Sequence, residues 1–273
     1  MPPPPPELPS VQVGFTDFAI DPDYRIRRHI LGMDGTNACN TNAAFSLRIA
    51  LRYLAPEGVD LSFISSDLIQ LGNVFIPKIS STAGGYHLDP EEQGGYQILV
   101  NYRSRGPRQV SLRELLEGKV DDQLDEWSRD RIVLIGLAEP KDAQFTPKQT
   151  ERMLGVTIHA QKASQLISAT LDNRPLIWWL PEWGEGLWIL LWAISSNGVV
   201  WVIYYSFRNR AAYGRFLHNH PLVCVVVLTG MTLSLWSICY LMLLTGGWLP
   251  LAPSLCVMVL SLGSSMYFNR LKP

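Results

Sequence analysis

Acidic residues are absent from the last third of the sequence. All 24 Asp and Glu lie at or before Glu185, whereas five of the 23 Lys and Arg lie beyond it. The chain up to Glu185 therefore has a net charge of −6 and the remainder one of +5. The overall charge of −1 consequently says little about partners. Because about 180 residues are enough for one compact domain with its own core, the charge boundary predicts a soluble domain followed by a segment of a different kind.

Cysteine is also scarce, with four in the whole chain. Cys224, Cys239 and Cys256 lie in apolar runs, where a thiol behaves as a small hydrophobic group. Cys39 is alone in the acidic part, so a disulfide within that part is excluded, and a packed or surface role is favoured over a reactive one. No two cysteines have the spacing of a zinc site, and no metal is expected.

Several motifs of catalytic and cofactor-binding proteins are missing. Gly136 and Gly155 are too isolated to form a phosphate-binding loop, and no Ser or Cys nucleophile context accompanies His159. No cofactor and no nucleic-acid partner is therefore expected. The chain opens with five prolines, Pro2–Pro6, instead of the basic and apolar regions of a signal peptide. Residues 1–10 are predicted to be a disordered, proline-rich leader.

Long apolar runs without charge fill the last third of the chain. The runs are Leu187–Phe207, Leu222–Thr245 and Trp248–Phe268. Each is long enough to cross a hydrocarbon core of roughly 30 Å. We therefore expect a three-helix transmembrane bundle in the plasma membrane, with the lipid bilayer as its surroundings.

Basic residues predict the orientation of these runs. They are Arg208, Arg210, Arg215, Arg270 and Lys272. The first three lie between the first and second runs, and the last two follow the third. Because basic loops stay in the cytoplasm, the loop 208–221 and the C-terminus are predicted to be cytoplasmic. Three crossings then place residues 1–180 on the extracytoplasmic side.

Residues 11–180 alternate between helix and strand patterns, which is typical of an α/β domain. Strands are expected at Val11–Ala19, Tyr24–Ile30, 71–77, Gly95–Tyr102 and Ile132–Ile135. The first two runs flank an Asp-Pro-Asp turn and suggest a hairpin. Its three arginines, at positions 25, 27 and 28, either bind an anion or, as we favour, pair with nearby acids on an exposed face.

Helices are expected at three places before residue 131. The first spans 40–54 and begins at Thr41 or Asn42, whose side chains can accept from free backbone N–H groups. A capping box, Ser111 with Glu114, starts a short second helix. The acidic piece 121–130 is predicted to be a third helix with Leu124 and Trp127 facing inward.

The stretch from Arg131 to Ile167 links the two parts of the chain. Ile132–Ile135 is entirely apolar and predicts a strand covered on both faces. The polar loop Glu139–Met153 follows it, and a helix is expected to begin near His159. Ligands of open α/β sheets bind beyond the carboxyl ends of strands. The candidate ligand-binding residues are Lys141, Asp142, Thr146 and His159. The alternative is that Asp142 and Thr146 bond backbone groups and only order the loop.

An ordered series of motifs carries a resemblance to a known family. The motifs are VGFTDFAIDPDYRIRRHI at 13–30, SLRIALRYL at 46–54, NYRSRGPRQVSLRELLEGKV at 101–120, RIVLIG at 131–136, FTP at 145–147 and GVTIHA at 155–160. The chain is similar from about residue 11 to its end to the second type of CHASE domain (cyclases/histidine kinases associated sensory extracellular), a bacterial sensor family. The resemblance implies an extracytoplasmic sensor that passes a signal through three helices to a separate cytoplasmic cyclase or kinase, and it implies a homodimer.

The chain departs from the family pattern in three ways. The leading transmembrane helix and the first part of the sensor domain are missing, and no output domain follows Pro273. Tyr24 stands where the family commonly has glycine after Asp-Pro-Asp. These departures predict a truncated reading frame or a degenerate copy, which an apolar segment encoded in frame upstream would support.

Two classes of function follow from the sequence. We favour a membrane-anchored signal-input module without catalysis, which binds an unknown extracytoplasmic ligand. In this interpretation the helix from His159 transmits the signal through Asn173-Arg174-Pro175 to the first membrane run. The alternative is a membrane-bound enzyme that uses the 139–159 loop, and it requires Asp142 and His159 to meet at one point. A scaffold without a ligand, or the product of a truncated pseudogene, are further alternatives.

Overall fold

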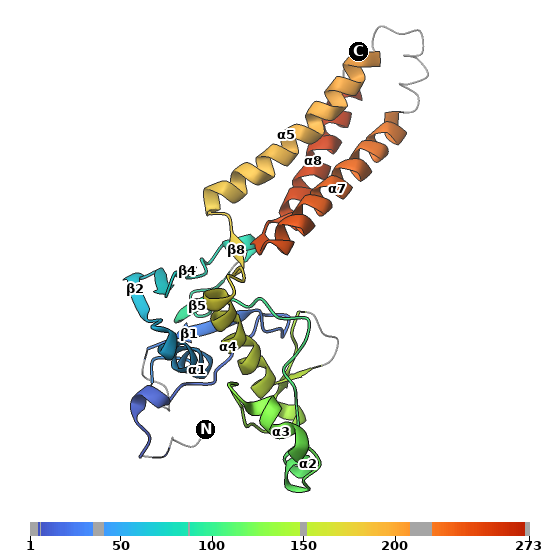
Figure 1. The fold of residues 1–273 in the computed structure, drawn as a ribbon. Helices are drawn as coiled ribbons and strands as arrows, with labels where there is room; N and C mark the ends of the chain where they lie inside the picture. The colour runs from blue at the N-terminus through green and yellow to red at the C-terminus, as the bar shows by residue number, and fades with distance from the viewer. Residues whose placement is uncertain are drawn as a thin grey trace. The chain divides into compact units, whose positions relative to one another are not determined.

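The computed structural model describes residues 5, 7–34, 41–86, 88–147, 152–207 and 220–270 (Figure 1). The chain divides into two compact units. The first unit comprises residues 1–80 and 88–176, and the second comprises residues 81–87 and 177–273. The first unit is a mixed α/β domain, and the second consists mainly of long helices.

A two-stranded antiparallel sheet lies at the centre of the first unit, where β1 (Arg28–Gly32) pairs with β5 (Tyr96–Leu99). Helix α1 (Phe45–Leu54) packs against helix α4 (Gly155–Leu171). The apolar residues of α1 recur every three or four positions, so Leu47 and Leu54 enter the same core as Leu166 of α4. The apolar spacing of α1 thus explains which side of the helix is buried.

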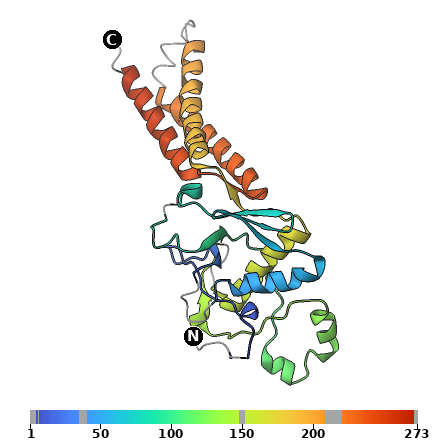
Figure 2. The ribbon, with the colours of Figure 1, turned by 90° about the vertical axis from the view of Figure 1, so that its left-hand side faces the viewer.

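A second sheet contributes to the same core (Figure 2). Strands β2 (Leu61–Ser65), β3 (Leu68–Leu71) and β4 (Val74–Pro77) form an antiparallel meander. Gly72 has a φ of +57°, a left-handed conformation that glycine adopts without strain, and this permits the tight turn between β3 and β4. The Tyr96 hydroxyl accepts from the Ile69 N–H at 3.0 Å and donates to the Ile76 carbonyl at 2.5 Å. These bonds attach the meander to β5.

Side chains of helix α4 form hydrogen bonds with the main chain of the segment that follows β5, where a neighbouring strand would otherwise do so. Gln165 donates to the Leu99 carbonyl at 2.8 Å and accepts from the Asn101 N–H at 3.1 Å. One turn earlier, Gln161 accepts from the Arg103 N–H at 3.0 Å. Because buried main-chain groups need partners, these two amides stabilise the edge on which α4 lies.

An exposed arm connects this segment to α4. It contains α2 (Leu112–Leu116) and α3 (Asp121–Ser128), and neither helix has a buried residue. The predicted capping box is confirmed, because Ser111 accepts from the Glu114 N–H and Glu114 accepts from the Ser111 N–H. Trp127 is half-buried beneath the Arg108 guanidinium, 3.9 Å from the ring centre.

The predicted buried strand at Ile132–Ile135 is wrong. These residues lie outside any strand, and the Ile135 side chain is 95 % exposed. The reason is that no strand of the described chain lies beside them. The polar loop instead contains a short antiparallel pair, β6 (Ala143–Gln144) with β7 (Met153–Leu154). Helix α4 then begins at Gly155, before the predicted start near His159.

The N-terminal predictions also need correction. Residues 11–19 hold the end of a 3-10 helix, η1 (Ser10–Gln12), rather than a strand. The expected hairpin is reduced to one bridge, Ala19 with Arg28. Helix α1 starts at Phe45 without a side-chain cap. Thr41 lies before the helix, where its hydroxyl donates to the Val13 carbonyl and accepts from the Ala43 N–H. Asn40, the first residue of the predicted helix, lies outside the described residues. The remaining 3-10 turns are η2 (Ala55–Glu57), η3 (Ala83–Gly85) and η4 (Pro140–Asp142).

The second unit contains three long helices, α5 (Glu182–Phe207), α7 (His220–Leu244) and α8 (Leu251–Arg270). Two stretches, Glu182–Val202 and Val225–Leu244, are long and apolar enough to cross a membrane. Most of their side chains point outward, which is typical of helices surrounded by lipid rather than by a protein core. The apolar stretch of α8, Leu251–Ser264, is shorter. The second unit thus contains three long helices, two of which are long and apolar enough for a membrane span, and the three-helix transmembrane bundle stays a prediction.

The three helices pack through small internal clusters. Trp192, Leu235 and Met258 form one cluster, one residue from each helix. The hydroxyls of Ser196 on α5 and Ser261 on α8 lie 3.0 Å apart. A short parallel pair, β8 (Trp178–Trp179) with β9 (Gly247–Trp248), lies at one end of the unit.

A polar cluster is buried beside α4 in the first unit. Lys162 is 1 % exposed, and its Nζ lies 4.6 Å from the centre of the Phe18 ring. His159 stacks on the same ring at 4.9 Å. Burial lowers the pKa of Lys162 to about 7. Burial, together with the positive charge of Lys162, lowers the pKa of His159 to about 4 and that of His29 well below its ordinary value.

We predict that the Lys162→Met variant changes how stability depends on pH. The unfolded chain binds more protons than the folded chain between the folded pKa of about 7 and the ordinary value of 10.5. The wild-type free energy of unfolding therefore rises with pH in this window, by at most ~1.4 kcal/mol per unit. The variant lacks this rise. Its free energy of unfolding is therefore larger than that of wild type at pH 7 and similar to that of wild type near pH 10.5. Urea unfolding of the detergent-solubilised chain, followed by circular dichroism, measures the difference.

The matched control is Lys119→Met, because Lys119 is an exposed lysine that carries an ion pair on the surface arm. This change should leave the slope between pH 7 and 10.5 as in wild type. Parallel curves for Lys162→Met and wild type would show that the buried amine does not destabilise the core.

Candidate functional site

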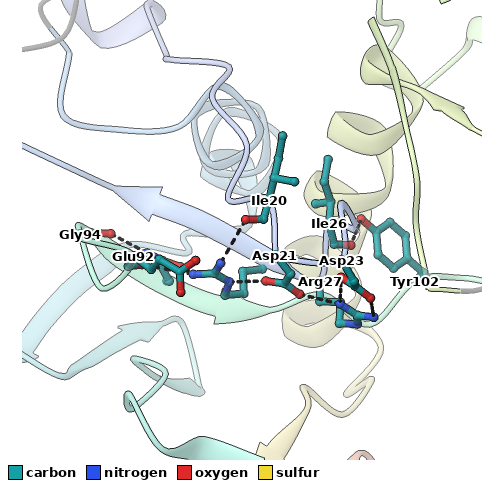
Figure 3. Close-up of polar contacts among 10 residues, drawn as sticks. Ile20, Asp21, Asp23, Ile26, Arg27, Glu92, Gly94 and Tyr102 are labelled. Atoms are coloured by element: carbon teal, nitrogen blue, oxygen red, sulfur yellow. Dashed lines mark hydrogen bonds and ion pairs between the residues drawn. The ribbon is translucent and has the colours of Figure 1, made fainter. Parts of the chain in front are cut away.

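The Asp-Pro-Asp turn is held by a buried ion pair (Figure 3). Asp21 accepts from Arg28 Nε at 2.7 Å, and both side chains are almost completely buried. Its other oxygen accepts from Arg27 at 2.8 Å, and Arg27 also donates twice to Asp23. The arginines therefore pair with nearby acids as predicted, but Arg28 does so inside the domain rather than on an exposed face.

Further hydrogen bonds connect this turn to the central sheet. Arg28 donates to Gln97 Oε1 at 3.0 Å and to the Glu92 carbonyl at 3.2 Å. The Tyr102 hydroxyl donates to the Ile26 carbonyl at 3.0 Å (Figure 3). Because a buried charge is costly without such partners, this network fixes the turn against β5.

Tyr24 occupies a strained position at the tip of the turn. Its φ is 60°, a left-handed conformation that costs an L-residue roughly 1–2 kcal/mol. Its N–H donates to the Asp21 carbonyl at 2.8 Å, which closes the turn. A glycine would adopt this geometry freely, so the tyrosine side chain is retained here at a cost in stability.

A pocket of about 410 Å³ opens beside this turn. It is lined by Asp23, Tyr24, Arg25, Lys141, Ala143, Gln144, Phe145 and Arg152. The turn and the β6–β7 segment meet there because the Ile26 N–H donates to the Phe145 carbonyl at 2.9 Å. Arg25 adds a bond from its guanidinium to the Thr146 carbonyl at 2.6 Å.

The charges of the pocket suit an anion. Arg25, Lys141 and Arg152 contribute three cations against the single carboxylate of Asp23. The Arg152 guanidinium lies 5.0 Å from the centre of the Phe145 ring, which orients it. Lys141 has an exposed ion pair with Glu139 at 2.6 Å, and an exposed pair of this kind exchanges easily.

The four predicted ligand-binding residues are distributed over different environments. Lys141 lines the pocket. Asp142 is half-buried in η4, and Thr146 is buried and accepts from Arg25 through its carbonyl. His159 lies in the core beside Phe18. The pocket lining includes neither Asp142 nor His159, so it does not supply the paired arrangement that the enzyme alternative requires.

Sequence reasoning missed the other cationic and aromatic residues of the pocket. Arg25 and Thr146 are 121 positions apart in the chain, so no local pattern joins them. Phe145 and Arg152 belonged to the predicted loop but were not selected as ligands. The available signal was the cluster of arginines after the Asp-Pro-Asp turn, which was assigned to surface ion pairs.

A separate contact lies within the second unit. The Gly84 N–H donates to Glu185 Oε1 of α5 at 2.6 Å. Tyr86 meets Trp248 edge to face with ring centres 5.3 Å apart. Gly84 has a φ of +61°, and a Cβ there would lie 3.0 Å from the Trp248 ring. The segment 81–86 is therefore held tightly by α5 and β9, and we refer to it as the latch.

One comparison with known proteins identifies the family. The family model of the CHASE2 domain matches residues 2–197, which is well over half of the chain. No curated protein and no solved structure matches the chain. The motif series and the family match agree with each other. The chain therefore belongs to the CHASE2 family of extracellular sensory domains.

Proposed function

We propose that this chain is a membrane-anchored signal-input module. In this proposal the first unit binds an extracytoplasmic ligand, and helices α5, α7 and α8 pass the change to a separate cytoplasmic cyclase or kinase. The observation that carries the proposal is that the CHASE2 match continues through residue 197 into the candidate span Glu182–Val202. The sensory region and the first apolar helix thus belong to one continuous family unit.

The proposed topology has three crossings. Two apolar stretches support the first two. The third crossing is proposed for α8, because Arg270 and Lys272 at its end favour a cytoplasmic C-terminus. This arrangement places residues 1–180 outside the cytoplasm.

Topology reporters inserted after Asp172 and after Arg210, or fused after Pro273, test this arrangement in the full chain. Alkaline phosphatase should be active only after Asp172, and green fluorescent protein should fluoresce after Arg210 and Pro273, because positively charged loops remain in the cytoplasm. A cytoplasmic signal after Asp172 would overturn the sensor proposal. A non-cytoplasmic signal after Pro273 alone would remove only the third crossing.

The proposed ligand is a small anion bound in the pocket beside Tyr24. The excess of cationic lining residues supports this charge. Planar guanidinium groups bind carboxylate and phosphate with two hydrogen bonds. The strained Tyr24 at the pocket mouth is the kind of backbone feature that concentrates at binding sites.

We predict that Arg152→Gln weakens binding of citrate or inorganic phosphate by roughly tenfold or more, because a charge-assisted hydrogen bond contributes about 1.5–3 kcal/mol. Calorimetric titration of the solubilised full chain measures the affinity. The control is Arg129→Gln, since Arg129 lies outside the pocket and carries its own exposed ion pair with Asp125. Equal losses in both variants, or no anion binding by wild type, would reject the pocket.

Transmission is proposed to use two connections along the chain. One is the segment after α4, where Arg174 donates to the Asn101 carbonyl at 2.8 Å. The other is the latch, which is joined through the chain to β4 on one side and to β5 on the other. Strand β5 is bonded to the Asp-Pro-Asp turn. A change at β5 can therefore reach the Glu185 contact along a short stretch of the chain.

We predict that Glu185→Gln loosens the latch. The amide oxygen still accepts a hydrogen bond, but loss of the charge removes the stronger, charge-assisted form. Hydrogen exchange at the Gly84 amide should accelerate about fivefold or more. The matched control is Glu182→Gln, an exposed acid in the first turn of the same helix. Equal acceleration in both variants would mean that the effect arises from the charge of the helix end rather than from the latch.

A further inference from the structure

The tyrosine at the tip of the Asp-Pro-Asp turn contributes little to the packing of the domain. Tyr24 is 76 % exposed, and no other aromatic ring of the described residues stacks on it. Its φ of 60° is nevertheless a conformation that costs free energy for any residue with a Cβ. The fold thus bears strain for a ring that it does not bury, and this ring is available to a molecule from outside the chain.

The pocket beside this ring contains a cation without an acidic partner. Arg152 lines the pocket together with Tyr24, and no ion pair joins it to an acid of the described residues. The Phe145 ring lies 5.0 Å from its guanidinium and orients the group while leaving its charge in place. Arg25 is less available, because its guanidinium already donates to the Thr146 carbonyl at 2.6 Å. Arg152 is therefore the main anchor that the pocket offers to a negative group.

The carboxylate in the lining of the pocket is already paired. Arg27 donates to the two oxygens of Asp23 at 2.7 and 2.5 Å (Figure 3). These hydrogen bonds hold the pKa of Asp23 below its ordinary value. The negative charge of Asp23 is thus balanced by Arg27, which is not among the lining residues. An incoming carboxylate therefore meets the cations of the pocket with little opposition from Asp23.

We propose that the anion of this pocket is an aromatic carboxylate, which binds Arg152 through its carboxylate and stacks its ring on Tyr24. This assignment rests on the proposed function, because it specifies the ligand class of the same pocket. A guanidinium and a carboxylate are both planar and are joined by two parallel hydrogen bonds. The pocket volume of about 410 Å³ is in the range of small-molecule sites and accommodates an acid with a single ring, such as benzoate.

The two parts of the site together select this class over simpler anions. Inorganic phosphate or acetate would bind Arg152 but would leave the Tyr24 ring exposed to water. An aliphatic acid would cover the ring with apolar surface but would lack the attraction between two aromatic rings, which acts in addition to the burial of area. An aromatic carboxylate makes both interactions at once, so it should bind more tightly than either of the other two classes.

Fluorine nuclear magnetic resonance of 4-fluorobenzoate with the detergent-solubilised full chain tests this preference. The resonance of the probe should shift and broaden on binding, and empty micelles provide the background from partition into detergent. Benzoate should displace the probe at a concentration about fivefold lower than cyclohexanecarboxylate does, because these two acids have the same charge and a similar size but only benzoate has an aromatic ring. Inorganic phosphate should displace the probe only at a higher concentration than benzoate.

Substitution of Tyr24 separates the role of the ring from the stability of the fold. Tyr24→Asn should weaken probe binding about fivefold or more and leave phosphate binding unchanged, whereas Tyr24→Phe keeps the ring and should bind the probe as wild type does. Because asparagine adopts a positive φ more readily than tyrosine, the urea midpoint of Tyr24→Asn should not fall below that of wild type. The matched control is Tyr53→Asn, which removes an exposed tyrosine of α1 outside the pocket and should leave probe binding unchanged.

Three results would overturn the assignment of an aromatic carboxylate. They are equal displacement of the probe by benzoate and cyclohexanecarboxylate, unchanged probe binding in Tyr24→Asn, and an equal loss of binding in Tyr24→Asn and Tyr53→Asn. A chain that binds phosphate or citrate but not 4-fluorobenzoate would also overturn the assignment, and it would leave the anion pocket of the proposed function in place. A chain that binds none of these anions would reject both the assignment and the pocket.

Discussion

The buried ion pair between Arg28 and Asp21 determines the geometry of the Asp-Pro-Asp turn, which lines the pocket. A charge left alone in such a site costs about 3–5 kcal/mol, so the pair is formed completely or the turn does not form. Asp21 also closes the turn through its carbonyl, which accepts from the Tyr24 N–H. The strain at Tyr24 is therefore balanced by the network at Arg28. Arg25, the next residue, points its guanidinium to the Thr146 carbonyl and so completes one wall of the pocket.

Helix α4 extends this constraint along the domain. Its buried face is polar for a core helix, because Gln161 and Gln165 stabilise main-chain groups that a neighbouring strand would otherwise bond. The same buried face carries Lys162 and His159 into the interior, where neither forms an ion pair with an acidic side chain of the described residues. The helix thus joins the central sheet to the segment after Asp172 at the cost of a buried amine that destabilises the fold at neutral pH.

Local signals in the sequence predicted local structure well. The capping box at Ser111, the strand around Tyr96–Leu99 and the helical structure of the charge-free runs within α5 and α7 all depend on neighbours in the chain, and all are present. The pocket could be predicted only in part. Lys141 was selected from its loop, but its partners Arg25 and Arg152 come together through hydrogen bonds between distant segments, and no spacing rule reports such contacts.

The segment at Ile132–Ile135 shows why a correct local pattern can give a wrong structure. An uninterrupted β-branched run indicates a strand with neighbours on its edges and faces, and that inference concerns the surroundings as much as the segment. The described residues supply α4 on one side and no main-chain hydrogen bond along the edges, so the same local pattern takes an exposed form without strand pairing.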